Sequence, residues 1–256
     1  MKVPPSYSLL RAGSVRVAIR RDLVPELGPW LLAPRLVLPA AAEPLGSGRG
    51  PAYRVGLANG LRVVVRVCRR GGLIARFVRE TYLGLRPRPL RELWVTTEAR
   101  RRGVAAAEVL AVRVEGRLAY RGALITSEVP AAATLLEALR RAPDAGARRA
   151  LAASAGRAIG TLHEAGVFHA DLNLTNILVH PGPGGPAIAL LDFDRARLQD
   201  TPLSATARRR NLQRLARSLV KLDPGRGLAG PEERRAFREA YASQGAAADR
   251  EIPCAS

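Results

Sequence analysis

Residues 167–179 read VFHADLNLTNILV, an apolar stretch that polar side chains interrupt at fixed positions. The polar members that matter here are His169, Asp171, Asn173 and Asn176. A buried strand needs none of them, so they either cap turns or bind a ligand. The residues that follow decide between these two interpretations.

A β-hairpin is predicted directly after this loop. Asn176 opens the strand NILV, residues 180–186 (HPGPGGP) are expected to form a turn, and residues 187–194 (AIALLDFD) are expected to form the second strand. In an antiparallel hairpin the start of the first strand lies opposite the end of the second. We therefore expect Asn176 and Asp192 at the same end of the hairpin, with Asp171 in the loop just before it.

This convergence of oxygen-bearing side chains has a chemical interpretation. A carboxylate and an amide oxygen are ligands that Mg²⁺ uses when phosphate oxygens complete its coordination. A further carboxylate that is left free of metal can orient an attacking hydroxyl and receive its proton. The pattern predicts a metal–nucleotide site at Asn176 and Asp192, and a substrate hydroxyl at Asp171.

The charge of the chain indicates an anionic partner. The 256 residues include 41 basic and 22 acidic side chains, a net charge of +19, and only Lys2 and Lys221 of the basic residues are not arginine. Such an excess favours nucleic acid, anionic lipid or phosphorylated substrates. Codon composition explains the preference for arginine equally well, but the positive field remains.

The expected compartment is the cytoplasm. The N-terminal segment lacks the apolar core of a signal peptide, and no uncharged apolar run approaches the roughly 18 residues of a spanning helix. Cys68 and Cys254 are far apart and form no disulfide framework, so a reducing environment is expected. We expect a soluble protein.

The secondary-structure pattern changes near residue 130. Strands that alternate in polarity dominate before it, with an Asn-Gly turn between AYRVGL and LRVVVRV that predicts a hairpin. Helical periodicity dominates after it. The expected layout is an N-terminal extension (1–45), a β-rich lobe (46–130) and a mainly helical lobe (131–256). The predicted helices cover residues 88–102, 133–141, 146–166, 206–222 and 230–241.

The two polar motifs resemble those of protein kinases. His169, Asp171 and Asn176 have the spacing of the kinase catalytic loop, H-x-D-x-x-x-x-N, with Ala170 at the position of its arginine. The sequence DFD at 192–194 is similar to the metal-binding D-F-G. The resemblance implies a two-lobed α+β kinase-like fold, ATP and Mg²⁺ as cofactors, and Asp171 as the catalytic residue.

The same resemblance assigns nucleotide contacts to the β-rich lobe. Gly46, Gly48 and Gly50 precede the first hairpin strand, where kinases cover the phosphates with a glycine-rich loop, although such clusters also form simple turns. The next strand carries Arg66 where kinases carry a phosphate-binding lysine. We expect Arg66 to pair with Glu92 of the following helix; the alternative is an outward-facing strand residue.

Three segments of the sequence indicate which family of kinases the chain resembles. VVVRVCRRGGL, YRGALITSEVP and HADLNLTNILV together are similar to the lipopolysaccharide kinases that phosphorylate 3-deoxy-D-manno-octulosonic acid (Kdo) or heptose, and more to those that act on Kdo. The resemblance implies ATP-dependent phosphorylation of a sugar hydroxyl on a lipid A-linked acceptor. It also implies a partner in the anionic membrane surface, peripheral binding to the cytoplasmic face of the inner membrane, and no specific nucleic acid.

Two other functions stay open. One is a kinase-like small-molecule phosphotransferase or a primitive protein kinase, whose acceptors are soluble. The other is a non-catalytic basic protein that binds RNA or membrane, with binding that collapses in salt and does not depend on Mg-ATP. Converging acidic residues would hinder a pure polyanion binder, and the low aromatic content of 4% argues against base stacking.

Overall fold

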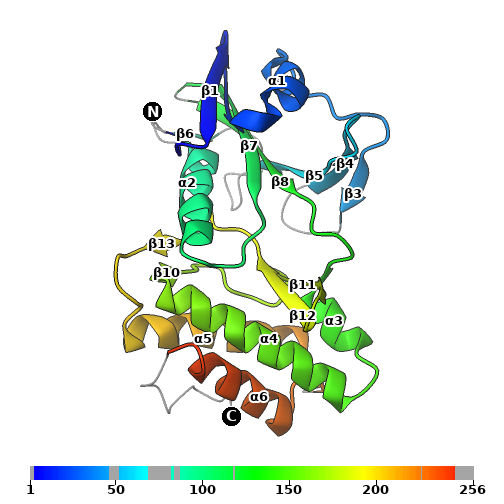
Figure 1. The fold of residues 1–256 in the computed structure, drawn as a ribbon, viewed down its shortest axis with the longest axis vertical. Helices are drawn as coiled ribbons and strands as arrows, with labels where there is room; N and C mark the ends of the chain where they lie inside the picture. Colours follow the sequence, from blue (N-terminus) through cyan, green and yellow to red (C-terminus); the bar gives the residue numbers. More distant parts are fainter. Residues whose placement is uncertain are drawn as a thin grey trace. The chain divides into compact units, whose positions relative to one another are not determined.

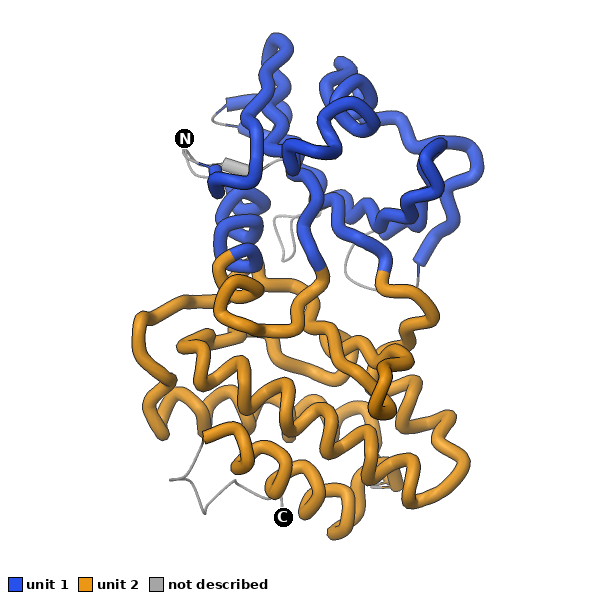
Figure 2. The backbone as a smooth tube through the Cα atoms, viewed as in Figure 1, with its two compact units in different colours: residues 1–97, 108–128 blue, residues 98–107, 129–256 orange. Residues whose placement is uncertain are grey.

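The computed structural model describes residues 3–45, 52–68, 82–83, 87–117, 119–225 and 227–245. The chain forms two compact units, residues 1–97 with 108–128 and residues 98–107 with 129–256 (Figure 2). Residues 1–45, expected as an extension, contribute three strands, a 3-10 turn and an α-helix to the first unit. The expected lobe boundary at 130 lies close to the observed division between residues 128 and 129.

The first unit is built on an antiparallel sheet of eight strands. Its order is β1-β2-β7-β8-β5-β4-β3, and β6 pairs with β8 (Figure 1). The strands are β1 (Tyr7–Ala12), β2 (Val15–Arg20), β3 (Glu43–Leu45), β4 (Ala52–Gly56), β5 (Arg62–Cys68), β6 (Tyr82–Leu83), β7 (Val109–Gly116) and β8 (Ala119–Ser127). The helices are η1 (Arg21–Leu23), a 3-10 turn, with α1 (Val24–Leu32) and α2 (Arg88–Arg101).

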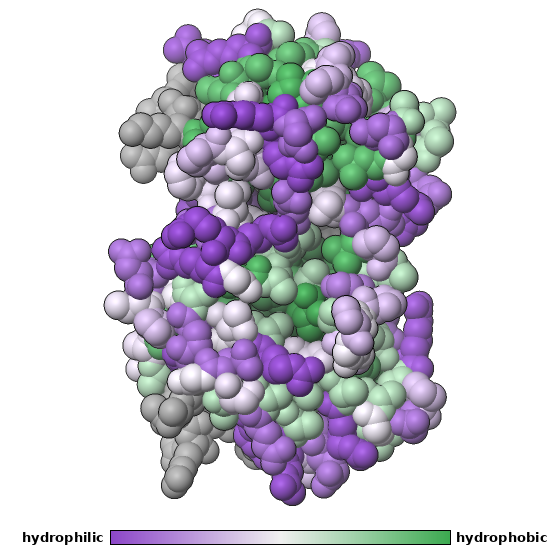
Figure 3. All heavy atoms as spheres, in the orientation of Figure 1, coloured by the Kyte–Doolittle hydropathy of each residue, from purple (hydrophilic) through white to green (hydrophobic). Residues whose placement is uncertain are grey.

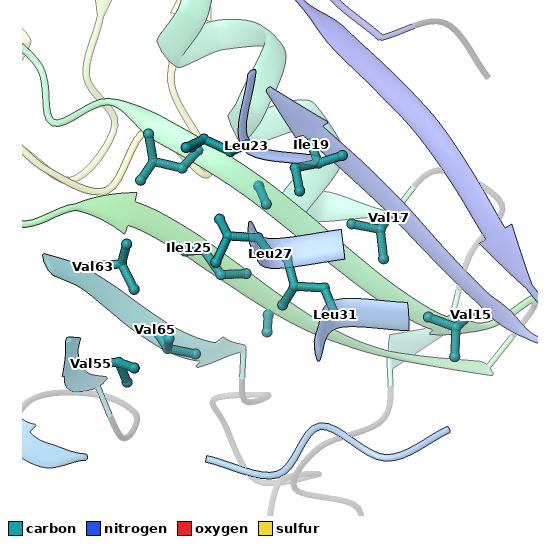
Figure 4. Packing of buried hydrophobic residues seen from close by; sticks show 13 residues of the cluster. Val15, Val17, Ile19, Leu23, Leu27, Leu31, Val55, Val63, Val65 and Ile125 are labelled. Atoms are coloured by element: carbon teal, nitrogen blue, oxygen red, sulfur yellow. The ribbon is translucent and has the colours of Figure 1, made fainter. Parts of the chain in front are cut away.

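Alternating side chains of this sheet enter two separate cores, as the two-residue period of a strand requires. Val17 and Ile19 pack with Leu27 of α1 in a cluster of aliphatic residues (Figure 4). Ala18 lies in the other cluster with Leu93 of α2. The sheet therefore buries both faces, one under α1 and one under α2.

The predicted hairpin is confirmed, since β4 pairs with β5 in antiparallel register. β7 pairs with β8 in the same way. β2 pairs with β7 so that Val17 lies opposite Arg113. Helix α2 agrees with the predicted helix over 88–102. Gly103 follows it at φ +86° and donates its N–H to the carbonyl of Arg100, as a glycine after a helix end often does.

The second unit is mainly helical. Its helices are α3 (Leu135–Arg141), α4 (Ala145–Glu164), α5 (Ala205–Leu222) and α6 (Pro231–Ala242), each at a predicted position. Its strands are β9 (Ala133–Thr134), β10 (Val167–Phe168), β11 (Ile177–Gly182), β12 (Gly185–Leu190) and β13 (Arg197–Leu198). They form a three-stranded sheet, β12-β11-β9, and a two-stranded sheet, β10-β13.

Close helix packing supports this unit. A Cβ atom added at Gly156 of α4 would collide with the backbone carbonyl of Phe237 in α6, so the two helices approach at a residue without a side chain. The segment before β7 also pairs with strand β12 of the β11–β12 hairpin. The carbonyl of Ala105 accepts from the N–H of Leu190, and the N–H of Ala107 donates to the carbonyl of Leu190. This pairing explains why residues 98–107 belong to the second unit.

The predicted turn of the hairpin was too long. Residues 180–186 were expected outside the strands, whereas β11 extends to Gly182 and β12 begins at Gly185. Pro181 lies opposite Pro186, and the third strand β9 pairs only with Leu178 and Val179. Proline is tolerated there because this end of the ladder requires no donor from it.

Candidate active site

The loop between β10 and β11 is tied to the segment after β12 through His169. Its side chain is fully buried, and its Nε2 donates to the carbonyl of Leu191 at 2.8 Å. Its ring meets the ring of Phe193 edge-on, with centroids 5.0 Å apart. Burial lowers the pKa of His169 against the opposing effect of this hydrogen bond. His169 is therefore a neutral structural residue, and it joins the two sequence motifs.

Asn173 shapes the loop from within. Its Oδ1 accepts from the N–H of Thr175 at 2.9 Å and from the N–H of Asn176 at 3.1 Å. Its Nδ2 donates to the carbonyl of Asp171 at 2.9 Å. The sequence left a capping role and an acceptor contact equally open. These contacts are those of a local side-chain cap, which fixes the backbone between Asp171 and Asn176.

Asn176 links the loop to the hairpin in the predicted way. Its backbone carbonyl accepts from the N–H of Leu191 at 2.9 Å, next to Asp192. Its Nδ2 donates to the carbonyl of Asp171 at 2.8 Å. Because the amide nitrogen is bound to protein, Oδ1 is the atom that this side chain offers to a cation. Asn176 therefore connects the loop, through Asp171, to the end of the hairpin, through Leu191.

Asp192 has a strained backbone. It lies in the left-handed region at φ +62°, two residues after the end of β12. For a residue with a Cβ atom this conformation costs about 1–2 kcal/mol. Strain of this kind accumulates at functional sites, where the surrounding structure holds it in place. The role of metal ligand that the sequence suggested for Asp192 stays a prediction.

The first unit contains the expected Arg66–Glu92 pair. Nη2 of Arg66, on β5, contacts both carboxylate oxygens of Glu92, on α2, with 2.5 Å to Oε2. The side chain of Glu92 is 4% exposed and that of Arg66 is 32% exposed. The pairing excludes the alternative of an outward-facing arginine. Its contact with nucleotide stays a prediction, and Gly46, Gly48 and Gly50 lie outside the described residues.

Sequence reasoning missed the contribution of α5 to the loop. Asn211, Arg214 and Ser218 lie on successive turns of this helix, and each contacts the loop. Asn211 bonds to the backbone N–H and carbonyl of His169, and the Oγ of Ser218 accepts from the N–H of Leu174 at 3.2 Å. Nη1 of Arg214 lies 3.7 Å from Oδ1 of the Asp171 carboxylate. The sequence did contain a signal for this contact. Asn211, Arg214 and Ser218 are spaced by three and four residues, so they form a polar stripe on the helix beside the stripe of leucines.

The catalytic-loop spacing, the paired hairpin ends and the strand arginine with its helical glutamate define a protein-kinase-like phosphotransferase. A family model described as "Lipopolysaccharide kinase (Kdo/WaaP) family" matches residues 43–241, and the chain belongs to this family. It is accordingly a phosphotransferase that acts on a sugar hydroxyl, and the kinase family implies use of ATP.

Known relatives agree with this assignment. The 3-deoxy-D-manno-octulosonic acid kinase of Xanthomonas campestris pv. campestris is 39% identical over 180 residues, which cover 68% of either chain. That of Stenotrophomonas maltophilia (strain K279a) is 35% identical over 207 residues, covering 78% of this chain and 79% of the relative. The predicted kinase-like α+β fold is confirmed by similarity to "WaaP in complex with acyl carrier protein". The TM-score is 0.58 at 18% identity, with 92% of this chain and 89% of that chain covered.

Proposed function

We propose that the chain transfers the γ-phosphoryl group of ATP to a hydroxyl of Kdo in the inner core of lipopolysaccharide, on a lipid A-linked acceptor. The observation that carries the proposal is the loop from His169 to Asn176, whose hydrogen bonds hold Asp171 beside the metal-ligand pair. The choice of Kdo over heptose is supported by the relatives that are 35–39% identical, which are 3-deoxy-D-manno-octulosonic acid kinases.

Asp171 is proposed as the residue that orients the acceptor hydroxyl. Its side chain is 35% exposed, and within the described part of the chain its carboxylate accepts no hydrogen bond. A carboxylate in this state can accept a hydrogen bond from the acceptor hydroxyl and take its proton while the oxygen attacks phosphorus in line. The backbone of Asp171 is fixed through its carbonyl, which accepts from Asn173 and Asn176.

The donor set at the hairpin fits Mg²⁺. Asn176 offers an amide oxygen because its nitrogen is bound to the loop, and Asp192 offers a carboxylate. Two hard oxygen ligands leave several positions of an octahedral ion for phosphate oxygens and water. When bound, Mg²⁺ would neutralise charge that develops on the transferred phosphoryl group. Arg66, with Glu92 fixing its orientation, is proposed to bind phosphate oxygens of ATP.

We also propose that the enzyme reaches its acceptor by binding reversibly to anionic lipid. The net charge is +19, and hydrophilic side chains cover much of the visible face of both units (Figure 3). Each basic residue near an anionic surface contributes roughly 1 kcal/mol of attraction. In the part of the chain that the structure describes, no helix is long and apolar enough to cross a membrane.

The test is phosphate transfer from radiolabelled ATP by the purified full chain with Mg²⁺. The acceptors are lipid A bearing Kdo, the same lipid bearing heptose as well, and lipid A without Kdo or heptose. We expect label only on the Kdo-bearing lipids. Asp171→Asn should lower kcat by about 10²- to 10⁴-fold with little change in the Kd of ATP. Asp200→Asn, which alters an exposed carboxylate of the same unit, is the control. Near-normal turnover of Asp171→Asn, or equal labelling without Kdo, would refute the proposal.

A further inference from the structure

Arg214 differs from the arginines that hold this unit together. Arg208, six residues earlier on α5, is buried, and it donates to the carbonyl of Leu203 at 2.7 Å and to Glu164 at 2.8 Å. Arg214 has a side chain that is 46% exposed, and its one ion pair among the described residues is with Asp171 at 3.7 Å. That separation is too long for a hydrogen bond. The guanidinium therefore keeps its five N–H donors while it stays beside the proposed catalytic carboxylate.

The helix fixes where this guanidinium lies. Asn211 and Ser218, three residues before and four residues after Arg214, bond to the backbone of the loop at 2.9–3.2 Å. Residues at these spacings share one face of a helix. Arg214 is therefore anchored between two contacts to the same loop. A ligand that binds to Asp171 therefore lies near the guanidinium of Arg214. The long side chain of Arg214 can move the short remaining distance to contact that ligand.

The chemistry of the acceptor supplies a ligand for this arginine. Octulosonic acid, the sugar for which the relatives are named, carries a carboxylate as well as hydroxyl groups. Guanidinium binds carboxylate through two parallel hydrogen bonds, which are among the stronger polar contacts in proteins. The phosphates of the nucleotide already have proposed partners in Mg²⁺ and Arg66. In the described part of the chain, Arg214 is the cation that lies beside the carboxylate of Asp171.

We propose that Arg214 determines specificity for an acidic sugar by binding the acceptor carboxylate while Asp171 holds the reacting hydroxyl. This inference rests on the proposed function, since it requires Kdo as the acceptor. The two contacts together select a sugar in which a carboxylate and the reacting hydroxyl are held at a fixed separation. A neutral sugar of the same size would lose one of the two contacts.

The experiment is a cycle of two proteins and two acceptors. Wild type and Arg214→Ala are assayed on Kdo-lipid A and on the same lipid with the Kdo carboxylate converted to a methyl amide. We expect Arg214→Ala to lose about 10- to 100-fold in kcat/KM on the acid, mainly through the acceptor KM, as for a lost hydrogen bond between charged groups. On the amide the two proteins should agree within about threefold, and the KM of ATP should not change.

Two further variants complete the design. Arg209→Ala removes the same charge from the same helix about 140° away, at about 100° per residue, and should leave both activities unchanged. Arg214→Lys keeps the positive charge but cannot make two parallel hydrogen bonds to a carboxylate. Its kcat/KM on the acid should therefore lie between those of wild type and Arg214→Ala. Circular dichroism checks that each variant is folded.

The outcomes separate the inference from the proposed function. Equal losses on acid and amide, or a raised KM for ATP, would show that Arg214 acts on the phosphoryl group and would overturn the inference. Unchanged activity of Arg214→Ala would overturn it as well. In both cases labelling of Kdo-lipid A by wild type upholds the proposed function. A wild-type protein that labels neither acceptor would refute the proposed function, and the inference would fall with it.

Discussion

Replacement of Asn211 by leucine tests whether α5 holds the catalytic loop. Asn211 is fully buried, its Nδ2 donates to the carbonyl of His169 at 2.9 Å, and its Oδ1 accepts from the N–H of the same residue at 3.0 Å. Leucine has the same branching but neither a donor nor an acceptor. The substitution therefore leaves two backbone groups of His169 without these partners in the protein interior, and it also removes the 3.2 Å contact between Oδ1 and the Nε2 of His163.

The expected cost follows from these two groups. A buried polar group that loses its partner costs about 1–3 kcal/mol, so Asn211→Leu should lower the free energy of unfolding by about 2–6 kcal/mol. Whole domains are stable by only about 5–15 kcal/mol. The variant should therefore unfold at a clearly lower urea concentration, and its kcat should fall because the backbone that positions Asp171 is less well held.

The assay has to follow the second unit. Both tryptophans, Trp30 and Trp94, belong to the first unit, so tryptophan fluorescence does not report on the loop. Circular dichroism follows the helices, and hydrogen exchange over residues 167–176 follows the loop itself. Gln213→Leu makes the same kind of change on α5 at a half-buried residue that has no hydrogen bond among the described residues.

One result would refute this reasoning. If the unfolding free energy of Asn211→Leu lies within about 0.5 kcal/mol of that of Gln213→Leu, the contacts of Asn211 do not hold the loop. Asn211→Asp gives a second comparison. It keeps an acceptor for the N–H of His169 but has no donor for the carbonyl, so its loss of stability should be intermediate.

Three other predictions concern the nucleotide, pH and the membrane. Arg66→Ala should raise the KM of ATP by about 10- to 100-fold, and Arg66→Lys by less; an unchanged ATP dependence would exclude Arg66 from the phosphate site. Burial lowers the pKa of His163 from 6.5 to about 4, so the neutral form stabilises the fold above pH 6.5. This contribution, about 3 kcal/mol in full, is lost as the pH falls toward 4. Urea unfolding between pH 7 and 4.5 should show this slope, and His163→Gln should flatten it; parallel curves would contradict a neutral buried imidazole. A high-salt wash should release the protein from membranes, since salt screens surface charge, and retention would indicate a hydrophobic anchor.

Local patterns in the sequence were enough for most of the fold. Asn-Gly between two alternating strands predicted the β4–β5 hairpin, and apolar periodicity predicted all four helices of the second unit. Strand β1 was not predicted, although it pairs with β2 across the short turn at Gly13 and Ser14. What no local signal encodes is the second partner of β2, since Val17 lies opposite Arg113, far along the chain.

The loop itself shows what spacing can and cannot assign. The motif predicted that Asp171 and Asn176 would meet the hairpin end, because strand pairing follows from the turn between the strands. It could not separate Asn173 from these two, since all three are short polar residues with similar turn preferences. The hydrogen bonds in the structure are needed to distinguish Asn173 from the other two residues. Asn173 uses both its oxygen and its nitrogen in hydrogen bonds inside the loop, whereas the carboxylate of Asp171 accepts no hydrogen bond from any residue that the structure describes.

For a similar reason, the sequence of α5 predicted only a helix that packs against the core. Its leucines repeat at helical spacing and predict a buried stripe, which Leu212 and Leu215 form. Asn211 and Arg214 stand one residue away from these leucines and resemble ordinary boundary residues, because their partners lie about 40 residues earlier in the sequence. A chain with a net charge of +19 also offers many arginines of similar appearance. What distinguishes Arg214 is its position, since the helix that buries its neighbours holds its guanidinium beside the carboxylate on which we expect the acceptor to bind.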